Sequence, residues 1–356
     1  MPPKKSNKRP KLSEADSKKG HVVSPASMKG ASQTSKALEL PLELLMEIIS
    51  YYKAIPIPCA PTDPSSPTFY HFVKPEYLER TDALRALSQT CRLWRNVFFP
   101  LLWQRLEACA THSASGAWYQ VLGESLIRKS FLVNENQEVA SNVRSMSVIL
   151  SRYSLSTVLP AFVRAIEALP NLTTLQILRV HHHMTTPIKT AFLGHRFPQI
   201  RTIMLPSYAH NVLRSCPEVR RVICTCYDAS KLVSAIAKEC KKVEEVEGFN
   251  GNERLMKRLA KAAPNLRSIK FTLQMTAESL RPLAALKNLS HITLQAVYNS
   301  SAEAALKDTQ TQFAIKVAKD IIKRSPGKKS IVLQCKGYDY TTMSALNWIE
   351  TIRHDD

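Results

Sequence analysis

Glycine is scarce in this chain, which has only 9 glycines among 356 residues. Folds that bind nucleotide phosphates depend on glycine-rich loops, because only glycine lets the backbone approach the phosphate groups closely. Neither a G-x-G-x-x-G nor a G-x-x-x-x-G-K-S/T motif occurs in the sequence. The composition therefore argues against a dinucleotide-binding or P-loop fold.

Long apolar runs are also absent. No stretch approaches the roughly 18 consecutive apolar residues that mark a membrane-spanning helix. The N-terminus is charged and lacks the apolar segment of a secretory signal. We therefore expect an intracellular, soluble protein without membrane contacts, whose eight cysteines are reduced thiols.

Recognisable catalytic and metal-binding motifs are missing as well. No H-E-x-x-H or G-x-S-x-G motif occurs, and Cys224 with Cys226 forms only one ligand pair, whereas structural zinc needs two. The adjacent residues His181–His183 would point in different directions from a strand or loop. We expect no metal, no cofactor and no catalytic residue, and hence no enzyme, although catalytic groups can also assemble from distant positions.

Positive charge is abundant, with a formal net charge of +20. Residues 1–36 hold nine Lys and Arg against Glu14 and Asp16, and they contain few large apolar side chains. Such a segment cannot bury enough surface to offset its ordering entropy, so we expect it to be disordered. Its basic cluster suggests nuclear import and a nuclear or cytoplasmic protein, although a solvated tail is the simpler alternative; the cluster comprises Lys4, Lys5, Lys8, Arg9 and Lys11.

Residues 38–107 predict a small helical unit. Apolar residues recur with helical spacing over 40–50, where Pro41 suits the first turn of a helix. A proline-rich insertion at about 53–80 interrupts the pattern, which returns at Asp82, and Pro100 is expected to open a further short helix. A unit this small leaves apolar surface uncovered, and such surface usually meets a partner.

The helical unit carries a set of apolar and polar residues in a fixed order: Leu40, Pro41, Glu43, Leu44, Leu45, Ile48, Leu84, Leu87, Ser88, Cys91, Arg92, Trp94, Arg95, Pro100, Leu102, Trp103 and Leu106. In this order, these residues resemble an F-box. The chain departs from the family pattern at the 53–80 insertion, because an F-box normally joins its first two helices by a short loop.

Beyond residue 140 the pattern L-x-x-L-x-L returns repeatedly, with helical runs between the copies. Strand and helix units repeated in this way predict an α/β fold with a parallel sheet and helices on one of its faces. The repeats resemble a leucine-rich-repeat solenoid with a degenerate consensus. We assign 108–140 to a helical linker, 141–343 to the solenoid, and 344–356 to a C-terminal cap whose residues 344–353 should form a helix.

Strand residues that point away from the predicted core carry many charges. One strand is acidic through Glu244, Glu245 and Glu247, while its neighbours on both sides are basic. These charges either compensate each other on a solvated face or form a docking groove for an acidic or phosphorylated target. The candidate target-binding residues are Arg201, Arg220, Arg221, Arg267, Lys270 and His291.

The layout of F-box and degenerate repeats is similar to that of basidiomycete-type fungal F-box proteins. This resemblance implies a non-catalytic substrate receptor that binds an Skp-type adaptor, and through it a cullin, in a ubiquitin ligase. By family position, the adaptor-binding residues are Leu40, Pro41, Leu44, Leu45, Ile48, Leu84, Leu87, Cys91, Trp94 and Trp103. Two alternatives remain: a basic nuclear nucleic-acid- or chromatin-binding scaffold, which lacks the motifs of known nucleic-acid folds, and an F-box scaffold that recruits no cullin.

Overall fold

The computed structural model describes residues 41–52, 75–111, 117–226, 228–297, 301–339 and 344–352. The chain divides into two units, Met1–Leu40 and Pro41–Asp356, and all described residues belong to the second. The predicted disordered tail, its basic cluster from Lys4 to Lys11, and Leu40 lie outside the described residues, as does most of the 53–80 insertion.

Helices α1 (Leu42–Ser50), α2 (Glu79–Thr90) and α3 (Arg92–Trp103) form the helical unit, with a short 3-10 helix, η3 (Pro75–Leu78), before α2. Pro41 precedes the first turn of α1, and its carbonyl oxygen accepts hydrogen bonds from the backbone N–H groups of Leu44 and Leu45. Cys91 separates α2 from α3 in an extended conformation, and its sulfur accepts a hydrogen bond from the N–H of Trp94 at 3.5 Å.

The expectation that Pro100 opens a separate helix is wrong. Pro100 lies inside α3, which continues without a break to Trp103. The chain break falls instead at Cys91, where the extended backbone ends α2 and the sulfur caps α3. A proline removes one hydrogen bond from a helix interior, and the packed residues Phe98 and Leu102 on either side keep the helix intact here.

The helical unit has a small core of its own. Ile49, Leu84, Phe98 and Leu102 are buried together, one or more from each helix. Trp103 packs against this cluster and also against the large core of the sheet, so the two apolar regions meet at the end of α3.

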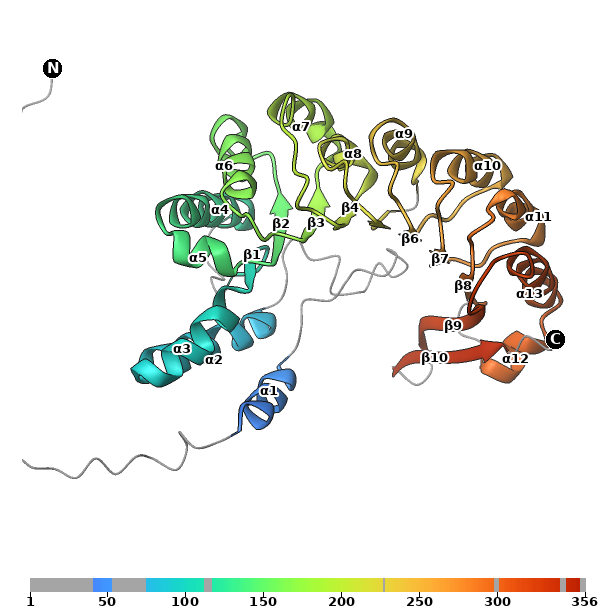
Figure 1. Ribbon diagram of the computed structural model, residues 1–356, viewed down its shortest axis with the longest axis horizontal. Coiled ribbons are helices and arrows are strands. Elements are labelled where there is room, and N and C mark those ends of the chain that lie inside the picture. Colours follow the sequence, from blue (N-terminus) through green and yellow to red (C-terminus); the bar gives the residue numbers. More distant parts are fainter. Residues whose placement is uncertain are drawn as a thin grey trace, which may run out of the picture. The chain divides into compact units, whose positions relative to one another are not determined.

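Within the described residues, ten strands form one sheet in chain order. Figure 1 shows the labelled strands following one another along this sheet. Strands β1 to β9 are parallel to their neighbours, and β10 is antiparallel to β9. The strands are β1 (Arg105–Ala108), β2 (Ser145–Leu150), β3 (Thr174–Val180), β4 (Thr202–Leu205), β5 (Arg221–Cys224), β6 (Glu245–Glu247), β7 (Ser268–Lys270), β8 (His291–Gln295), β9 (Ser330–Asp339) and β10 (Ser344–Ile352).

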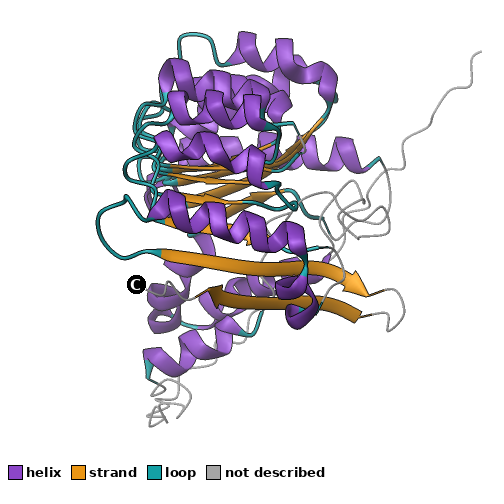
Figure 2. Cartoon of the chain, turned by 90° about the vertical axis from the view of Figure 1, so that its right-hand side faces the viewer, coloured by secondary structure: helices purple, strands orange, loops and turns teal. Residues whose placement is uncertain are grey.

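Helices connect the strands and form a layer on one face of the sheet, which is visible in Figures 1 and 2. They are α4 (Trp118–Glu135), α5 (Gln137–Asn142), α6 (Leu155–Glu167), α7 (Thr185–Ala191), α8 (His210–Arg214), α9 (Ser230–Glu239), α10 (Glu253–Ala262), α11 (Ala277–Leu280), α12 (Ala302–Lys307) and α13 (Thr309–Ile322). Short 3-10 helices accompany them: η4 (His182–Met184), η5 (Ser207–Ala209) and η6 (Arg281–Ala285). The predicted α/β architecture with a mostly parallel sheet is therefore confirmed.

The strand register places the apolar positions of successive sequence repeats next to one another. One residue from each of strands β2 to β9 lies in a continuous buried row beneath the helices: Met146, Leu175, Ile203, Val222, Val246, Ile269, Ile292 and Ile331. Side chains alternate between the two faces of a strand, so the flanking positions point to the second face of the sheet. That second face carries the charged residues of β5 to β7.

The C-terminal segment departs from its prediction. Residues 344–352 form strand β10 instead of a capping helix, and β10 pairs along β9 from Ser344 with Asp339 to Ile352 with Ile331. Figure 2 shows these two strands as the long pair at one end of the sheet. The apolar residues of this short segment fit both periods, and pairing with β9 satisfies the backbone groups that an edge strand would leave exposed.

Among the described residues, no helix combines the length and the apolar character that a membrane span requires.

Candidate protein-docking surfaces

Helix α1 presents two different faces. Ile49 is only 4 % exposed, and Leu45 packs against the same core. Leu44 and Ile48 are each 51 % exposed, and Met46 is also exposed. Residues four apart lie on the same side of a helix, so Leu44 and Ile48 form a continuous apolar strip that the helical unit itself does not cover.

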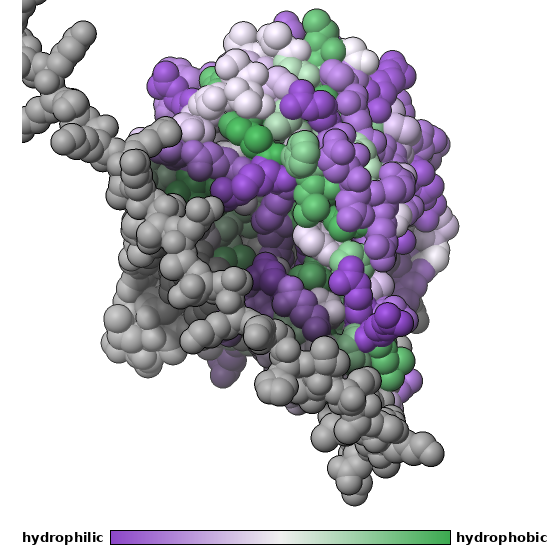
Figure 3. All heavy atoms as spheres, turned by 90° about the vertical axis from the view of Figure 1, so that its left-hand side faces the viewer, coloured by the Kyte–Doolittle hydropathy of each residue, from purple (hydrophilic) through white to green (hydrophobic). Residues whose placement is uncertain are grey.

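The other predicted adaptor-binding residues divide between core and surface. Leu84 is fully buried, and Cys91 serves as the cap of α3. Leu87, Trp94 and Trp103 are half-buried against the core of the helical unit. Leu93, which the sequence did not single out, is exposed on α3. Figure 3 views the molecule from the left-hand side of Figure 1 and shows apolar side chains as separate areas among polar ones.

A partly buried polar contact joins the helical unit to the edge of the sheet. Thr81 Oγ1 of α2 donates to Glu107 Oε2 of β1 at 3.4 Å, and the ammonium of Lys129 on α4 donates to the Glu107 carbonyl oxygen. Burial raises the pKa of the Glu107 carboxyl and lowers the pKa of the Lys129 ammonium. These contacts link α2 to β1, and β1 to α4.

Charges on the second face of the sheet pair across neighbouring strands. The Arg221 guanidinium lies 3.7 Å from Glu245 Oε2 and 3.2 Å from Glu247 Oε2. Lys270 Nζ lies 2.9 Å from Glu247 Oε1 on the other side. Glu247 is therefore held between one basic residue of β5 and one of β7.

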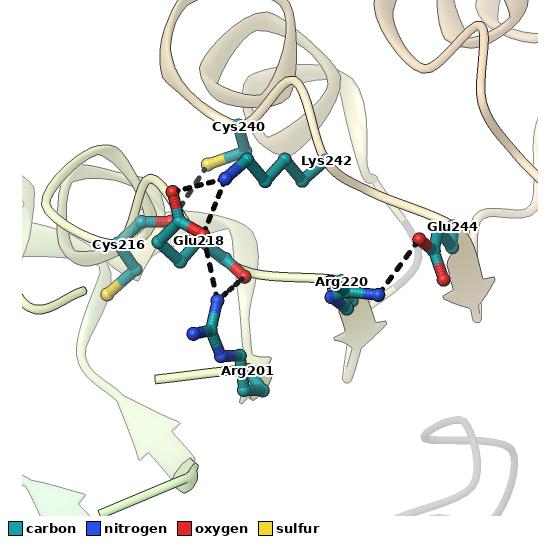
Figure 4. A network of polar contacts seen from close by, with 7 residues as sticks. All are labelled: Arg201, Cys216, Glu218, Arg220, Cys240, Lys242 and Glu244. Atoms are coloured by element: carbon teal, nitrogen blue, oxygen red, sulfur yellow. Dashed lines mark hydrogen bonds and ion pairs between the residues drawn. The ribbon is translucent and has the colours of Figure 1, made fainter. Parts of the chain in front are cut away.

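The same pairing continues just before the strands begin, as Figure 4 shows. Arg201 Nη1 and Lys242 Nζ lie 2.9 and 2.7 Å from the Glu218 carboxylate, and Arg220 Nη1 lies 3.2 Å from Glu244 Oε1. Hydrogen bonds from Lys242 and then Arg201 lower the pKa of Glu218. Four of the six predicted target-binding cations thus have carboxylate partners: Arg201, Arg220, Arg221 and Lys270.

The other two, Arg267 and His291, lie together at a pocket of about 490 Å³. No ion pair joins either side chain to a carboxylate in the part of the chain that the structure describes. His291 Nδ1 contacts Ser290 Oγ at 2.8 Å. We call this the β7–β9 pocket, and its lining is Glu245, Arg267, Ser268, Asn288, Ser290, His291, Pro326 and Lys328.

Lys328 was missed by the sequence reasoning. It lies two residues before β9, whereas Arg267 lies directly before β7. The strand register makes Lys329, and not Lys328, equivalent to Arg267, so a comparison of successive repeats would not have found Lys328.

The sequence contains two small groups of metal-ligand residue types, the pair Cys224 and Cys226 and the run His181–His183. Cys224 and Cys226 lie close together, with 3.5 Å between their sulfur atoms. The His181 ring stacks on the rings of His182 and His183, with centroids 4.3 and 5.2 Å apart, and the His182 and His183 rings are tilted at 4.0 Å. In the described ranges, no group of three or more His, Cys, Asp or Glu side chains is arranged to hold a metal ion.

No protein-family model matches this chain, and no curated protein matches it in sequence. The proposed function therefore rests on the residues of this chain and on the geometry described above.

Proposed function

We propose that the chain is a non-catalytic substrate receptor of an Skp–cullin–F-box ubiquitin ligase, with residues 38–107 as the F-box and the repeats as a degenerate leucine-rich-repeat solenoid. The observation that carries the proposal is the exposed apolar strip of Leu44 and Ile48 on α1. The helical unit leaves this strip uncovered although it buries Ile49 one position further along the same helix. Uncovered apolar side chains at this spacing suit a groove on a partner protein.

The proposed mechanism is positional. The helical unit binds the Skp-type adaptor, the sheet unit holds a target protein, and the cullin-bound partner brings the ubiquitin carrier near the target. Joining both sites in one chain raises their effective concentration for each other. The contact of Thr81 with Glu107 supports this role, because it ties the helical unit to the edge of the sheet.

For the target, we propose an acidic or phosphorylated segment that binds at the β7–β9 pocket. Arg267, His291 and Lys328 line it with positive or ionisable groups, against the single carboxylate of Glu245. Guanidinium groups bind carboxylate and phosphate oxygens with paired hydrogen bonds. Arg201, Arg220, Arg221 and Lys270 contribute less in this proposal, because neighbouring carboxylates already neutralise them.

The target proposal predicts a contrast between two charge reversals. Arg267→Glu with Lys328→Glu should reduce recovery of co-purifying targets, whereas Arg201→Glu should reduce it far less. Both variants should recover the adaptor normally, which shows that folding and the F-box remain intact. Equal target recovery by both variants would refute the pocket as the target site.

Co-purification tests the receptor role itself. Intact protein expressed in fungal cells should recover an Skp-type adaptor and a cullin, and the pair Leu44→Ala and Ile48→Ala should lose both. Leu193→Ala is a matched control, because Leu193 is an exposed apolar residue outside the helical unit. Recovery of the adaptor without a cullin would instead support a scaffold that directs no degradation.

One observation favours a second function. The net charge of +20 suits binding to nucleic acid or chromatin in the nucleus. The basic cluster from Lys4 to Lys11, which would also direct nuclear import, lies outside the described residues. Submicromolar binding to duplex DNA that weakens steeply with salt would support this alternative.

A further inference from the structure

Two cysteines lie at the carboxyl end of β5. Cys224 is the last residue of the strand and is buried in the main core, and Cys226 follows in the connection to α9 and is partly exposed. Their sulfur atoms are 3.5 Å apart. A disulfide bond needs about 2.05 Å, so a shift of roughly 1.5 Å would join them, and Cys226 lies outside any strand or helix and can supply it.

The surroundings of Cys226 stabilise a thiolate. The Cys224 sulfur lies 3.5 Å from the Cys226 sulfur, and the hydrogen bond between them contributes most to a lowered pKa of Cys226. The backbone N–H of Ser207 also donates to the Cys226 sulfur, at 3.2 Å. Burial and the nearby Asp228 carboxylate oppose the effect, and the pKa of Cys226 nevertheless falls to about 6. The same hydrogen bond and burial raise the pKa of Cys224. One sulfur is therefore poised as a nucleophile, and the other lies beside it as a protonated thiol.

The other described cysteines lack this combination. Cys109, Cys216, Cys240 and Cys335 are buried, and burial raises the pKa of the first three. Cys91 is partly exposed, and its sulfur accepts the N–H of Trp94 as the cap of α3. Among the described residues, the juxtaposition of a partly exposed sulfur with a second sulfur is specific to Cys224 and Cys226.

We propose that Cys224 and Cys226 are an oxidation site at which a hydroperoxide converts two neighbouring thiols into a disulfide bond. The Cys226 thiolate attacks one peroxide oxygen and the O–O bond breaks, which gives a sulfenic acid and, after protonation, one water or alcohol. The Cys224 sulfur then attacks the Cys226 sulfur, the S–O bond breaks, and the Cys224 proton leaves with the hydroxyl group as water. The cysteines lose two electrons and the peroxide gains them. This inference is independent of the proposed ligase role.

Peptide mapping of the full-length protein tests the proposal. Cleavage after Arg221 and Lys231 releases residues 222–231, a peptide whose only cysteines are Cys224 and Cys226. After a stoichiometric dose of hydrogen peroxide at pH 7.4 and blocking with N-ethylmaleimide in denaturant, which exposes the buried thiols, this peptide should be about 2 Da lighter than the reduced, unblocked peptide. It should then carry no maleimide, while peptides with the other cysteines remain labelled.

Two variants separate the steps. Cys224→Ser should stop at a sulfenic acid on Cys226 that dimedone traps, and Cys226→Ser should slow oxidation of this peptide about tenfold or more. Cys91→Ser is the control and should oxidise like the wild type. The proposal fails if wild-type protein keeps both thiols of the peptide after peroxide while Cys91 is oxidised, and it fails equally if Cys226→Ser does not slow the reaction. The wild-type measurement stands even if a variant fails to fold.

Discussion

Lys270 on β7 and Glu247 on β6 form an ion pair on the second face of the sheet, with Lys270 Nζ 2.9 Å from Glu247 Oε1. The Glu247 side chain is only 7 % exposed, and it also pairs with Arg221 on β5. One nearly buried carboxylate thus links three successive strands. We therefore expect the alternation of basic and acidic strands to contribute to the stability of the sheet.

Loss of this carboxylate should destabilise the sheet. Glu247→Gln removes a nearly buried charge that two cations share, and we expect it to lower the free energy of unfolding by about 1.5–3 kcal/mol. Glu244→Gln is the matched control, because its pairing with Arg220 is more exposed. That change should cost less than about 1 kcal/mol. Urea denaturation measures both, and equal losses would contradict the account.

A second prediction concerns two glycines with positive φ. A Cβ atom at Gly248 (φ 77°) would lie 2.3 Å from the Cys224 carbonyl oxygen, whereas one at Gly194 (φ 83°) would meet no atom within 4 Å. Gly194→Ala should cost only the backbone strain, about 1–2 kcal/mol. Gly248→Ala adds a backbone clash of roughly 1–3 kcal/mol. Thermal denaturation should therefore give Gly248→Ala the lower melting temperature, and the reverse order would be inconsistent with the geometry.

The pH dependence of cysteine alkylation provides a third prediction. At pH 7 a thiol with a pKa of about 6 is about 90 % ionised, whereas one with a pKa of about 8.5 is about 3 % ionised. Alkylation of Cys226 by iodoacetamide should therefore rise as pH increases through about 6 and level off above 7. Cys224→Ala removes a donor to the thiolate and should move the midpoint upward. A wild-type midpoint at pH 8 or above would refute a stabilised thiolate.

A fourth prediction separates core from surface in the helical unit. Leu84 is fully buried, so Leu84→Ala should lower the free energy of unfolding of this unit by about 2–5 kcal/mol. Leu44→Ala removes a half-exposed side chain and should cost less than about 1 kcal/mol. Hydrogen exchange of the amides in α2 and α3 measures the local effect. Equal loss of protection in both variants would mean that Leu44 belongs to the core.

Most of the sheet could be predicted from the sequence because its signal repeats. Residues such as Leu175, Ile203 and Val222 occupy the same place in successive copies, and in the structure they are adjacent in one buried row. A segment that occurs only once in the chain has no repeated copies to confirm its pattern. Residues 344–352 fit either period, and only pairing with β9 decides the outcome. The prediction at Pro100 was wrong for a similar reason. The tendency of proline to begin or break a helix was outweighed by packing on both sides of it.

The charged residues on the second face of the sheet could be predicted only in part. Each of the repeats could be aligned, and the alignment places Arg220 and Arg221 beside Glu244 and Glu245. The pairing of these charges could therefore be predicted from the sequence. The proximity of Arg267 to Lys328 was harder to find, because Lys328 belongs to the long connection from β8 to β9 and does not occupy the repeat position equivalent to Arg267.

Binding of purified full-length protein to a purified Skp-type adaptor tests the central claim most directly. Calorimetry should show a defined complex for the wild type and for Leu193→Ala, because apolar burial drives the contact. Leu44→Ala with Ile48→Ala should weaken binding about tenfold or more, since partial burial of two such side chains contributes roughly 1.5–3 kcal/mol in total, while the circular dichroism spectrum stays unchanged. Absence of binding by folded wild-type protein, or equal affinity of this double variant, would contradict the account.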